Sequence, residues 1–480
     1  MGGIIGAILV AIVPKALGPI AYGQFIYLQD FFAKAIGFLD MGTSIAFFTK
    51  LSADNKRKEL MTFYFLYALI IFIVMLLFIV SIDIFDYSDT LLPNIPNEFV
   101  YFGLFLGFFS WLSQLLMKIS DAYALTVSVE LIKITHKVLS LFLLLFLIYN
   151  TSFGLDKYFY FNYFVFISLF VILSWLFIQK GIFSHIFNFN FSISQLSKEF
   201  IDYCHPLLAY SIIGLIAGFF DIWLLQKIGG SEQTGFYGLA YALATMCFLF
   251  TSAMTPIITR EFSKSYAQEN LKEMRRLFYR YIPMLYSIAG FFSVFVSMQS
   301  ENILQIFTDE QFKDAYVVLV VMAYYPIHQT YGQLSGSIFY ATGQTKLMRN
   351  ISFFTMPLGA LLTLLLIYFL KLDALGLAIK MIVIQFIGVN IQLYFNAKFL
   401  KLDIKHFISH QFYSVLFFII LSYISNKLID VSSSLLSFIY SGILYTCLVI
   451  IFTYIFPQVF ATTREEIKEF SLRIMGVIKK

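Results

Sequence analysis

The sequence contains the stretch KALGPIAYGQF at residues 15–25 and a related stretch, KIGGSEQTGFY, at residues 227–237. Four positions match at an offset of 212 residues (227 − 15): Lys15 and Lys227, Gly18 and Gly230, Gly23 and Gly235, Phe25 and Tyr237. Each copy follows one apolar segment and opens another, and its glycines suit a chain that reverses or packs closely at that point. The pattern therefore indicates a duplicated architecture, which in membrane proteins is typical of transporters with a path between two repeats.

The composition indicates a polytopic membrane protein. Of 480 residues, 60% are hydrophobic and 13% are charged, whereas about a quarter are charged in soluble proteins. The apolar run 2–13 has no basic flank or cleavage motif of a signal peptide, and it is short for a ~30 Å hydrocarbon core, so we expect a curtailed first helix. Cys204, Cys247 and Cys447 lie in apolar runs, so we expect neither a disulfide framework nor a metal site.

Apolar runs of spanning length predict about fourteen transmembrane helices in an all-α protein. Six runs fall in each half and two follow at the end: 2–14, 23–48, 61–82, 99–119, 133–150, 158–179; 203–226, 235–258, 281–299, 315–341, 351–370, 374–396; 412–429 and 435–456. The offset of 212 residues spans six helices, an even number, so the two repeats should be parallel.

Lysine and arginine gather in alternate loops, whereas the acidic clusters 83–98 and 301–314 fall in the opposite set. This bias predicts that both termini are cytoplasmic, in agreement with the helix count. The predicted domains are a six-helix lobe, a cytoplasmic linker, a second six-helix lobe, an appended helix pair and a basic tail: 1–180, 181–202, 203–397, 398–457 and 458–480.

Several short motifs, in this order, resemble those of a known family. They are LGP at 17–19, YG at 22–23, FLDMG at 38–42, FD at 220–221, GFY at 235–237, PIITREF at 256–262, ATGQTK at 341–346 and LGLA at 375–378. Together they resemble bacterial polysaccharide-biosynthesis flippases of the multidrug/oligosaccharidyl-lipid/polysaccharide (MOP) exporter superfamily. The sequence departs from that pattern at Asp221-Ile222, where the family usually has Asp-Arg.

The resemblance implies transport of an undecaprenyl-pyrophosphate-linked oligosaccharide from the inner to the outer leaflet of the bacterial cytoplasmic membrane. It implies alternating access between two lobes, driven by an H⁺ or Na⁺ gradient, in the synthesis of O-antigen, capsule or another surface polysaccharide, including lipopolysaccharide. The implied partners are membrane lipids, a polysaccharide polymerase and a chain-length regulator. We expect no other cofactor and no nucleic-acid partner.

A lipid diphosphate needs compensating cations, and ionisable residues inside membrane helices are costly enough to suggest function. Lys34 and Lys380 lie within predicted helices and are the first candidates for pyrophosphate binding, with Lys34 alternatively paired to Asp30 on the same helix. Basic residues nearer the cytoplasmic ends form a second set, which the bias for positive loops also explains. These are Lys118, Lys133, Lys137, Arg260 and Arg349.

Coupling to an ion requires a group that changes its charge inside the membrane. Asp221 is the first candidate because it lies among aromatic residues, although a structural pairing with Lys227 is the alternative. Asp30, Asp40 and His205 are further candidates.

Three other functions remain open. A lipid-linked peptidoglycan-precursor flippase would also need cations in its cavity. A multidrug exporter of the same superfamily would need an acidic or aromatic cavity instead. A membrane polysaccharide polymerase would normally carry a large outer loop with catalytic residues, and the outer loops here are short. We therefore expect a transporter and not an enzyme.

Overall fold

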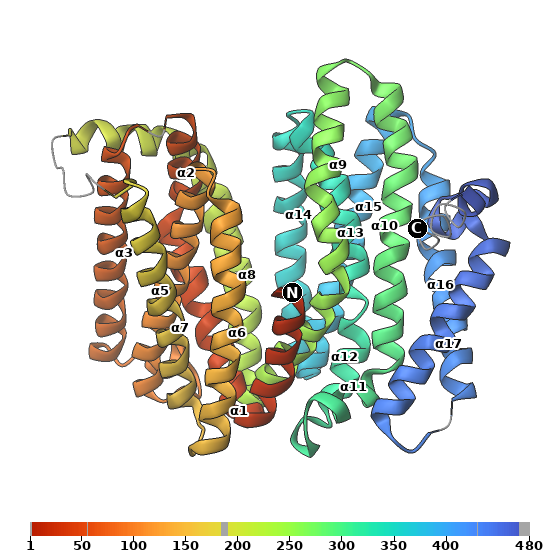
Figure 1. The fold of residues 1–480 in the computed structure, drawn as a ribbon, viewed down its shortest axis with the longest axis horizontal. Helices are drawn as coiled ribbons and strands as arrows, with labels where there is room; N and C mark the ends of the chain where they lie inside the picture. Colours follow the sequence, from red (N-terminus) through yellow and green to blue (C-terminus); the bar gives the residue numbers. More distant parts are fainter. Residues whose placement is uncertain (1, 55, 184–190, 430, 470–480) are drawn as a thin grey trace. The chain divides into compact units, whose positions relative to one another are not determined.

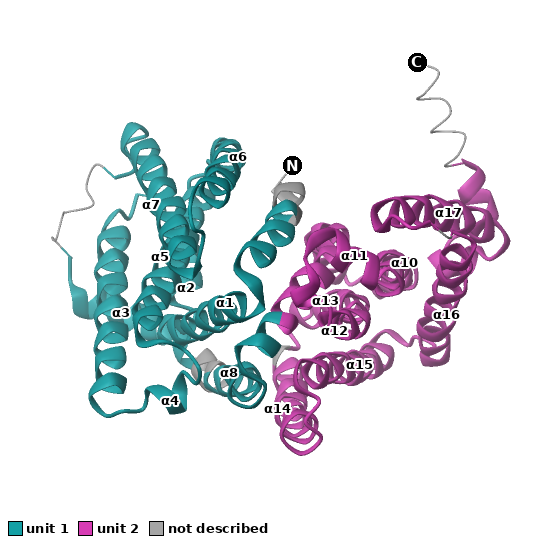
Figure 2. Ribbon diagram, turned by 90° about the horizontal axis from the view of Figure 1, so that it is seen from below, with its two compact units in different colours: residues 1–235 teal, residues 236–480 magenta. Residues whose placement is uncertain are grey.

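The computed structural model describes residues 2–54, 56–183, 191–429 and 431–469 (Figure 1). Helices account for nearly all of these residues, and no strand occurs among them. The predicted all-α class is therefore confirmed. Contacts divide the chain into two compact units, residues 1–235 and 236–480, shown in teal and magenta in Figure 2. The boundary falls inside a helix, so the predicted lobes 1–180 and 203–397 stay a prediction about the repeat.

The described residues of the first unit form seven complete helices and most of an eighth. They are α1 (Gly2–Asp40), α2 (Thr43–Ala53), α3 (Glu59–Ile84), α4 (Ser88–Leu91), α5 (Asn97–Ala122), α6 (Thr126–Asn150), α7 (Leu155–Gln179) and α8 (Ile193–Thr245).

The second unit contains the remaining helices. They are η1 (Met246–Phe248), α9 (Leu249–Ala267), α10 (Leu271–Met298), α11 (Ser300–Phe307), η2 (Glu310–Phe312), α12 (Ala315–Met322), α13 (Tyr325–Ala341), α14 (Thr345–Thr363), η3 (Leu364–Phe369), α15 (Asp373–Leu400), α16 (Ile404–Leu428), α17 (Ser434–Ile455) and η4 (Pro457–Phe460).

The predicted number of fourteen spans is not confirmed. Among the described residues, eleven helices are long and apolar enough to cross a membrane. Residues 8–40 and 212–267 each form one such stretch, although the sequence predicts two spans in each. The predicted span 315–341 is divided into α12 and α13, because Pro326 at the start of α13 cannot donate a backbone hydrogen bond to the preceding turn.

Two glycines in the repeated stretch kink their helices in the same way. Gly18 in α1 has φ 75° and ψ 168°, and Gly230 in α8 has φ 74° and ψ −174°. This conformation is essentially restricted to glycine. Gly18 and Gly230 therefore each separate two helical segments, as the sequence predicts, within the stretches labelled α1 and α8. The shared geometry supports the alignment of the two stretches.

Each unit has its own apolar core. In the first unit, Leu60 and Tyr64 of α3 pack with Leu116 and Ile119 of α5, and all four are fully buried. In the second unit, α10, α13, α15 and α16 pack around Phe278, Leu334, Leu393 and Phe418. Large apolar side chains also cover the outside, for example Leu69, Ile70 and Leu77 on α3. An apolar exterior of this kind is suited to contact with lipid.

Candidate functional site

The ammonium group of Lys34 connects two helices of the first unit. Its Nζ donates hydrogen bonds to Oδ2 of Asp30 at 2.5 Å and to the backbone carbonyl of Gly218 at 2.6 Å. Lys34 and Asp30 are one turn apart on α1, and Gly218 belongs to α8. The lysine side chain packs directly over Gly218, where a Cβ would lie 3.4 Å from Cε of Lys34. The predicted pairing with Asp30 is therefore present, and it holds Lys34 against α8.

A second carboxylate lies beside this ion pair. Asp221 follows Gly218 by three residues on α8 and repels the carboxylate of Asp30 electrostatically. Asp30, Lys34 and Asp221 thus form a half-buried cluster of one cation and two anions. The alternative partner of Asp221, Lys227, has its Nζ 4.7 Å from the centre of the Trp223 ring.

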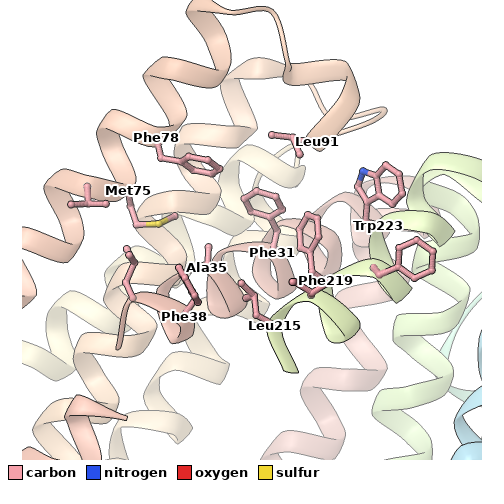
Figure 3. Close-up of a pocket in the computed structure, with 13 residues that line it drawn as sticks. Phe31, Ala35, Phe38, Met75, Phe78, Leu91, Leu215, Phe219 and Trp223 are labelled. Carbon is pink, nitrogen blue, oxygen red and sulfur yellow. The ribbon is translucent and has the colours of Figure 1, made fainter. Parts of the chain in front are cut away.

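An apolar cavity of about 450 Å³ adjoins the same helices (Figure 3). Its wall comes from α1, α3, α8 and the end of α4: Phe31, Ala35, Phe38, Leu39, Val74, Met75, Phe78, Leu91, Leu215, Ile216, Phe219, Phe220 and Trp223. The rings of Phe31 and Phe219 meet with centroids 5.1 Å apart, so the aromatic contact joins α1 to α8 as Lys34 does. Several of these side chains are exposed on the outside of the unit, among them Ile216 and Phe78. The cavity suits a hydrocarbon chain and not a sugar.

Asp40 lies at the centre of a buried polar network where α1 ends. Its Oδ1 accepts hydrogen bonds from the Tyr64 hydroxyl at 2.8 Å and from the Thr43 hydroxyl and the Ser44 backbone N–H, both at 3.1 Å. Its Oδ2 accepts one from the Ser44 hydroxyl at 2.8 Å. Lys118 of α5 donates to the same Ser44 hydroxyl at 2.5 Å. The network therefore joins α1, α2, α3 and α5, and it uses both Asp40 and Lys118.

His205 lies on a separate cavity of about 280 Å³ that also includes Thr43, Tyr67 and Cys204. The sequence predicts a helix that starts at residue 203, but α8 begins at Ile193, so His205 lies inside the helix. The imidazole is exposed, and Thr43 connects its cavity to the Asp40 network.

Lys380 occupies a buried position in the second unit, with 8% of its surface exposed. It lies on α15, and its Nζ faces Gly359 of α14, where a Cβ would be 3.5 Å away. Like Lys34, Lys380 therefore packs over a glycine of a neighbouring helix. A Cβ at Gly359 would lie 3.1 Å from Cε of Lys380 and would crowd it, whereas a Cβ at Gly218 would make an ordinary contact with Lys34.

The remaining basic candidates lie at separate places. Lys133 pairs with Glu130 on α6, and Lys137 is exposed on the same helix. Arg260 is exposed on α9. Arg349 on α14 donates a hydrogen bond to the side-chain oxygen of Asn350, and its guanidinium group lies over the ring of Phe353. Within each unit, the structure does not gather these residues around Lys34 or Lys380. Among the residues described, no three His, Cys, Asp or Glu side chains gather as metal ligands would.

Sequence reasoning missed three partners. Gly218 contributes a backbone carbonyl, which no side-chain pattern reveals. Ser44 and Tyr64 complete the Asp40 network. Asp40 and Ser44 lie on either side of the Met41–Gly42 turn between α1 and α2, so their contact depends on the geometry of that turn.

The fold is that of a family of membrane transporters. It matches a lipid II flippase, MurJ, in an inward closed conformation, with a TM-score of 0.69, 13% identity, and coverage of 94% of this chain and 96% of the other. It matches an inward-facing multidrug resistance MATE family transporter of the MOP superfamily with a TM-score of 0.61, 14% identity, and coverage of 83% and 94%. A MOP superfamily transporter from Pyrococcus furiosus gives a TM-score of 0.56, 17% identity, and coverage of 83% and 92%.

Matches to sequence families identify the family within this class of membrane transporters. Residues 1–261 match the model of the family described as polysaccharide biosynthesis protein, and residues 206–365 match that of the MatE family. The chain belongs to the polysaccharide biosynthesis protein family, within the MOP superfamily, as its motifs predict. No curated protein matches the sequence.

Proposed function

We propose that this protein is a flippase that moves an undecaprenyl-pyrophosphate-linked oligosaccharide from the inner to the outer leaflet of the bacterial cytoplasmic membrane. The observation that carries the proposal is the position of Lys34, whose ammonium group is held between Asp30 and the carbonyl of Gly218 inside membrane helices. A cation is costly there and suits the transient binding of an anion. Flipping breaks no covalent bond, so the protein acts as a carrier and not as an enzyme.

The cluster of one cation and two carboxylates provides a means of coupling. When a substrate diphosphate binds the ammonium group of Lys34, it replaces the carboxylate of Asp30 as the partner of that group. Asp30 then lies beside Asp221 without the charge of Lys34 to offset their repulsion. Two neighbouring carboxylates in a medium of low dielectric constant repel each other, and this repulsion favours the binding of H⁺ or Na⁺. Release of that ion restores the Lys34–Asp30 pair and expels the diphosphate. Binding of cargo and binding of the ion thus alternate at one site.

The apolar cavity beside the cluster suits a lipid-linked cargo. The cavity and the Lys34–Gly218 bond involve the same helices, α1 and α8. A hydrocarbon chain in the cavity would keep its diphosphate close to this pair of helices, while the sugars remain outside the cavity. In the second unit, the buried Lys380 on α15 is a separate candidate for binding an anion.

The distribution of lysine and arginine supports a cytoplasmic position for both termini. Oligosaccharide delivered to the outer leaflet would then be taken over by a polysaccharide polymerase and a chain-length regulator, in O-antigen, capsule or related synthesis.

Deletion and complementation in the source bacterium test the proposal. Loss of surface polysaccharide on deletion, recovery with the wild-type gene, and no recovery with a normally expressed Lys34→Ala variant are the expected results. The exposed Lys198 on α8 supplies a matched control, and Lys198→Ala should restore polysaccharide. Unchanged polysaccharide with increased drug sensitivity would favour a multidrug exporter instead. Arrested growth with accumulated peptidoglycan precursor would favour the precursor flippase.

A further inference from the structure

Two histidines and two tyrosines form a buried cluster in the second unit. Tyr286 of α10 lies in the middle, with its ring centroid 5.7 Å from that of Tyr331 and 5.9 Å from those of His328 and His410. His328 and Tyr331 belong to α13, and His410 belongs to α16. Tyr286, Tyr331 and His410 are each only 1% exposed. These helices lie within one unit (Figure 2).

Four polar atoms of this cluster have no hydrogen-bond partner in the described part of the chain. They are the hydroxyls of Tyr286 and Tyr331 and the Nδ1 atoms of His328 and His410. Nearly all buried polar atoms in folded proteins are paired, so isolated exceptions usually mark a ligand, a water or a functional role. Four exceptions in one cluster indicate a place where a small polar species binds.

The hydrogen bonds of His410 define which of its nitrogens can accept a proton. Its Nε2 lies 2.9 Å from the backbone carbonyl of Val459, so Nε2 carries the hydrogen of the neutral ring. Ser287 donates to the same carbonyl at 2.5 Å and therefore reinforces this arrangement. The lone pair of Nδ1 is left facing the buried interior.

We propose that this cluster is a hydrated proton-binding site and that Nδ1 of His410 is the atom that takes up the proton. A proton arriving through water adds to the lone pair of Nδ1, no other bond breaks, and the resulting imidazolium donates from both nitrogens. The proposal rests on the proposed transport function, and it assigns H⁺ and not Na⁺ as the ion that the second unit binds. The four side chains offer hydroxyl and imidazole groups without a carboxylate, a set that suits H⁺ far better than Na⁺.

Few other titratable groups face His410. Tyr286 faces it from α10, and Tyr331 and His328 of α13 reach it through Tyr286. Its own helix contributes Tyr413, whose ring lies 5.1 Å away, and the more distant His406. From η4 only the Val459 carbonyl contacts it. In the described part of the chain, neither a carboxylate nor an ammonium group acts on His410.

Protonation of His410 has a structural consequence at η4. A hydrogen bond from an imidazolium is stronger than one from a neutral ring. The proton would therefore tighten the bond between α16 and Val459, which lies just after α17. A proton bound at His410 would thereby hold η4 more tightly against α16.

The test compares His410→Gln with His406→Gln in the full-length protein reconstituted in liposomes. Glutamine at position 410 retains an N–H for Val459 but cannot take up a proton, and His406 is an exposed control on the same helix. Nitrogen NMR of histidine-labelled wild type should show one ring, absent in His410→Gln, changing from the neutral Nε2–H form to the doubly protonated form as the pH falls. A ring at position 410 that stays neutral until the protein unfolds would overturn the proposal.

Flipping under an imposed pH gradient provides the second measurement. The probe is a fluorescent undecaprenyl-pyrophosphate oligosaccharide. Wild type and His406→Gln should flip faster with the gradient than without it. The gradient should accelerate His410→Gln less than wild type, because only the proposed ion site at Asp30 and Asp221 remains in that variant. Tyr286→Phe, which removes an unpaired hydroxyl and leaves the ring, should shift the pH at which His410 titrates. If wild type does not flip the probe at all, the proposed function fails while the NMR result still decides the proton site. If His410→Gln responds to the gradient as wild type does, the proton site fails while the flippase stands.

Discussion

Gly23 of α1 and Gly235 of α8 meet with no side chain between their helices. A Cβ at Gly23 would overlap the carbonyl oxygen of Ser231, and a Cβ at Gly235 would overlap the carbonyl oxygen of Pro19. Pro19 and Ser231 are separated by the same 212 residues as Gly23 and Gly235. The two copies of the repeated stretch therefore contact each other reciprocally, which explains why both copies keep a glycine at this position.

Gly23→Ala should destabilise the protein, because the added methyl group must push two backbones apart. Overpacking in a close-packed site costs about 1–3 kcal/mol, so the midpoint of thermal unfolding in detergent should fall. Gly37 on the same helix has no atom near its would-be Cβ, and Gly37→Ala should leave the midpoint unchanged or raise it. Equal midpoints for Gly23→Ala and wild type would show that the two helices do not pack in this way.

Asp40→Asn should lower stability as well as any transport. The carboxylate accepts four hydrogen bonds from Thr43, Ser44 and Tyr64, and an amide cannot accept all of them. The loss of such a buried acceptor costs roughly 1–3 kcal/mol. Thermal unfolding of the purified variant measures this cost. A stable Asp40→Asn protein with a changed response to ion gradients would instead support the predicted ion-coupling role.

The sequence predicted the class of fold and the repeat, but not the extent of each helix. Gly18 and Gly230 were found from spacing alone, and the structure gives them the same unusual backbone conformation. Their helices were expected to break there, because a glycine pair at a segment boundary looks like a turn. The non-helical conformation of Gly18 and Gly230 confirms both breaks. Hydropathy does not show where a helix starts outside the membrane, so α8 begins at Ile193, ten residues before the predicted span.

The candidate site could be predicted only in part. The pairing of Lys34 with Asp30 follows from their spacing on a helix. The carbonyl of Gly218 lies 184 residues from Lys34 and can be found only from the packing of α1 on α8. The same limit applies to the cluster around Tyr286, whose members are separated in sequence and meet through tertiary contacts.

The start of α8 is held by an ion pair that should depend on pH. Glu199 accepts hydrogen bonds from Lys50 at 3.2 Å and Arg57 at 3.4 Å. Burial alone would raise the pKa of Glu199, but the hydrogen bonds and charges of Arg57 and Lys50 outweigh it and lower this pKa. The pair therefore stabilises the folded protein above the ordinary carboxylate pKa, and this stabilisation is lost as the pH falls through the lowered value.

Comparison of wild type with Glu199→Gln checks this dependence. The difference in unfolding free energy should be on the order of 0.5 kcal/mol at neutral pH, as for other partly exposed pairs. It should shrink as the pH falls below about 4, where the carboxylate of an unfolded chain is already protonated. A difference that stays constant or grows on acidification would contradict the role of this pair.

Lys380→Met should separate stability from transport. Lys380 is 8% exposed on α15, and methionine keeps an unbranched side chain in this position while it removes an ammonium group that is costly to place inside a membrane. We therefore expect an unchanged or higher thermal midpoint together with reduced surface polysaccharide in the complementation assay. Full complementation by a stable Lys380→Met protein would assign Lys380 to structure alone.

The most direct test of the account measures flipping by variants of Lys34. Purified protein in liposomes is given a fluorescent undecaprenyl-pyrophosphate oligosaccharide, and the rate at which the probe reaches the opposite leaflet is recorded. A hydrogen bond to a charged group contributes roughly 1.5–3 kcal/mol, so Lys34→Ala should be about ten- to a hundredfold slower than wild type. Lys34→Arg should retain part of the rate and Lys198→Ala all of it. A folded Lys34→Ala protein that flips the probe at the wild-type rate would contradict the central claim.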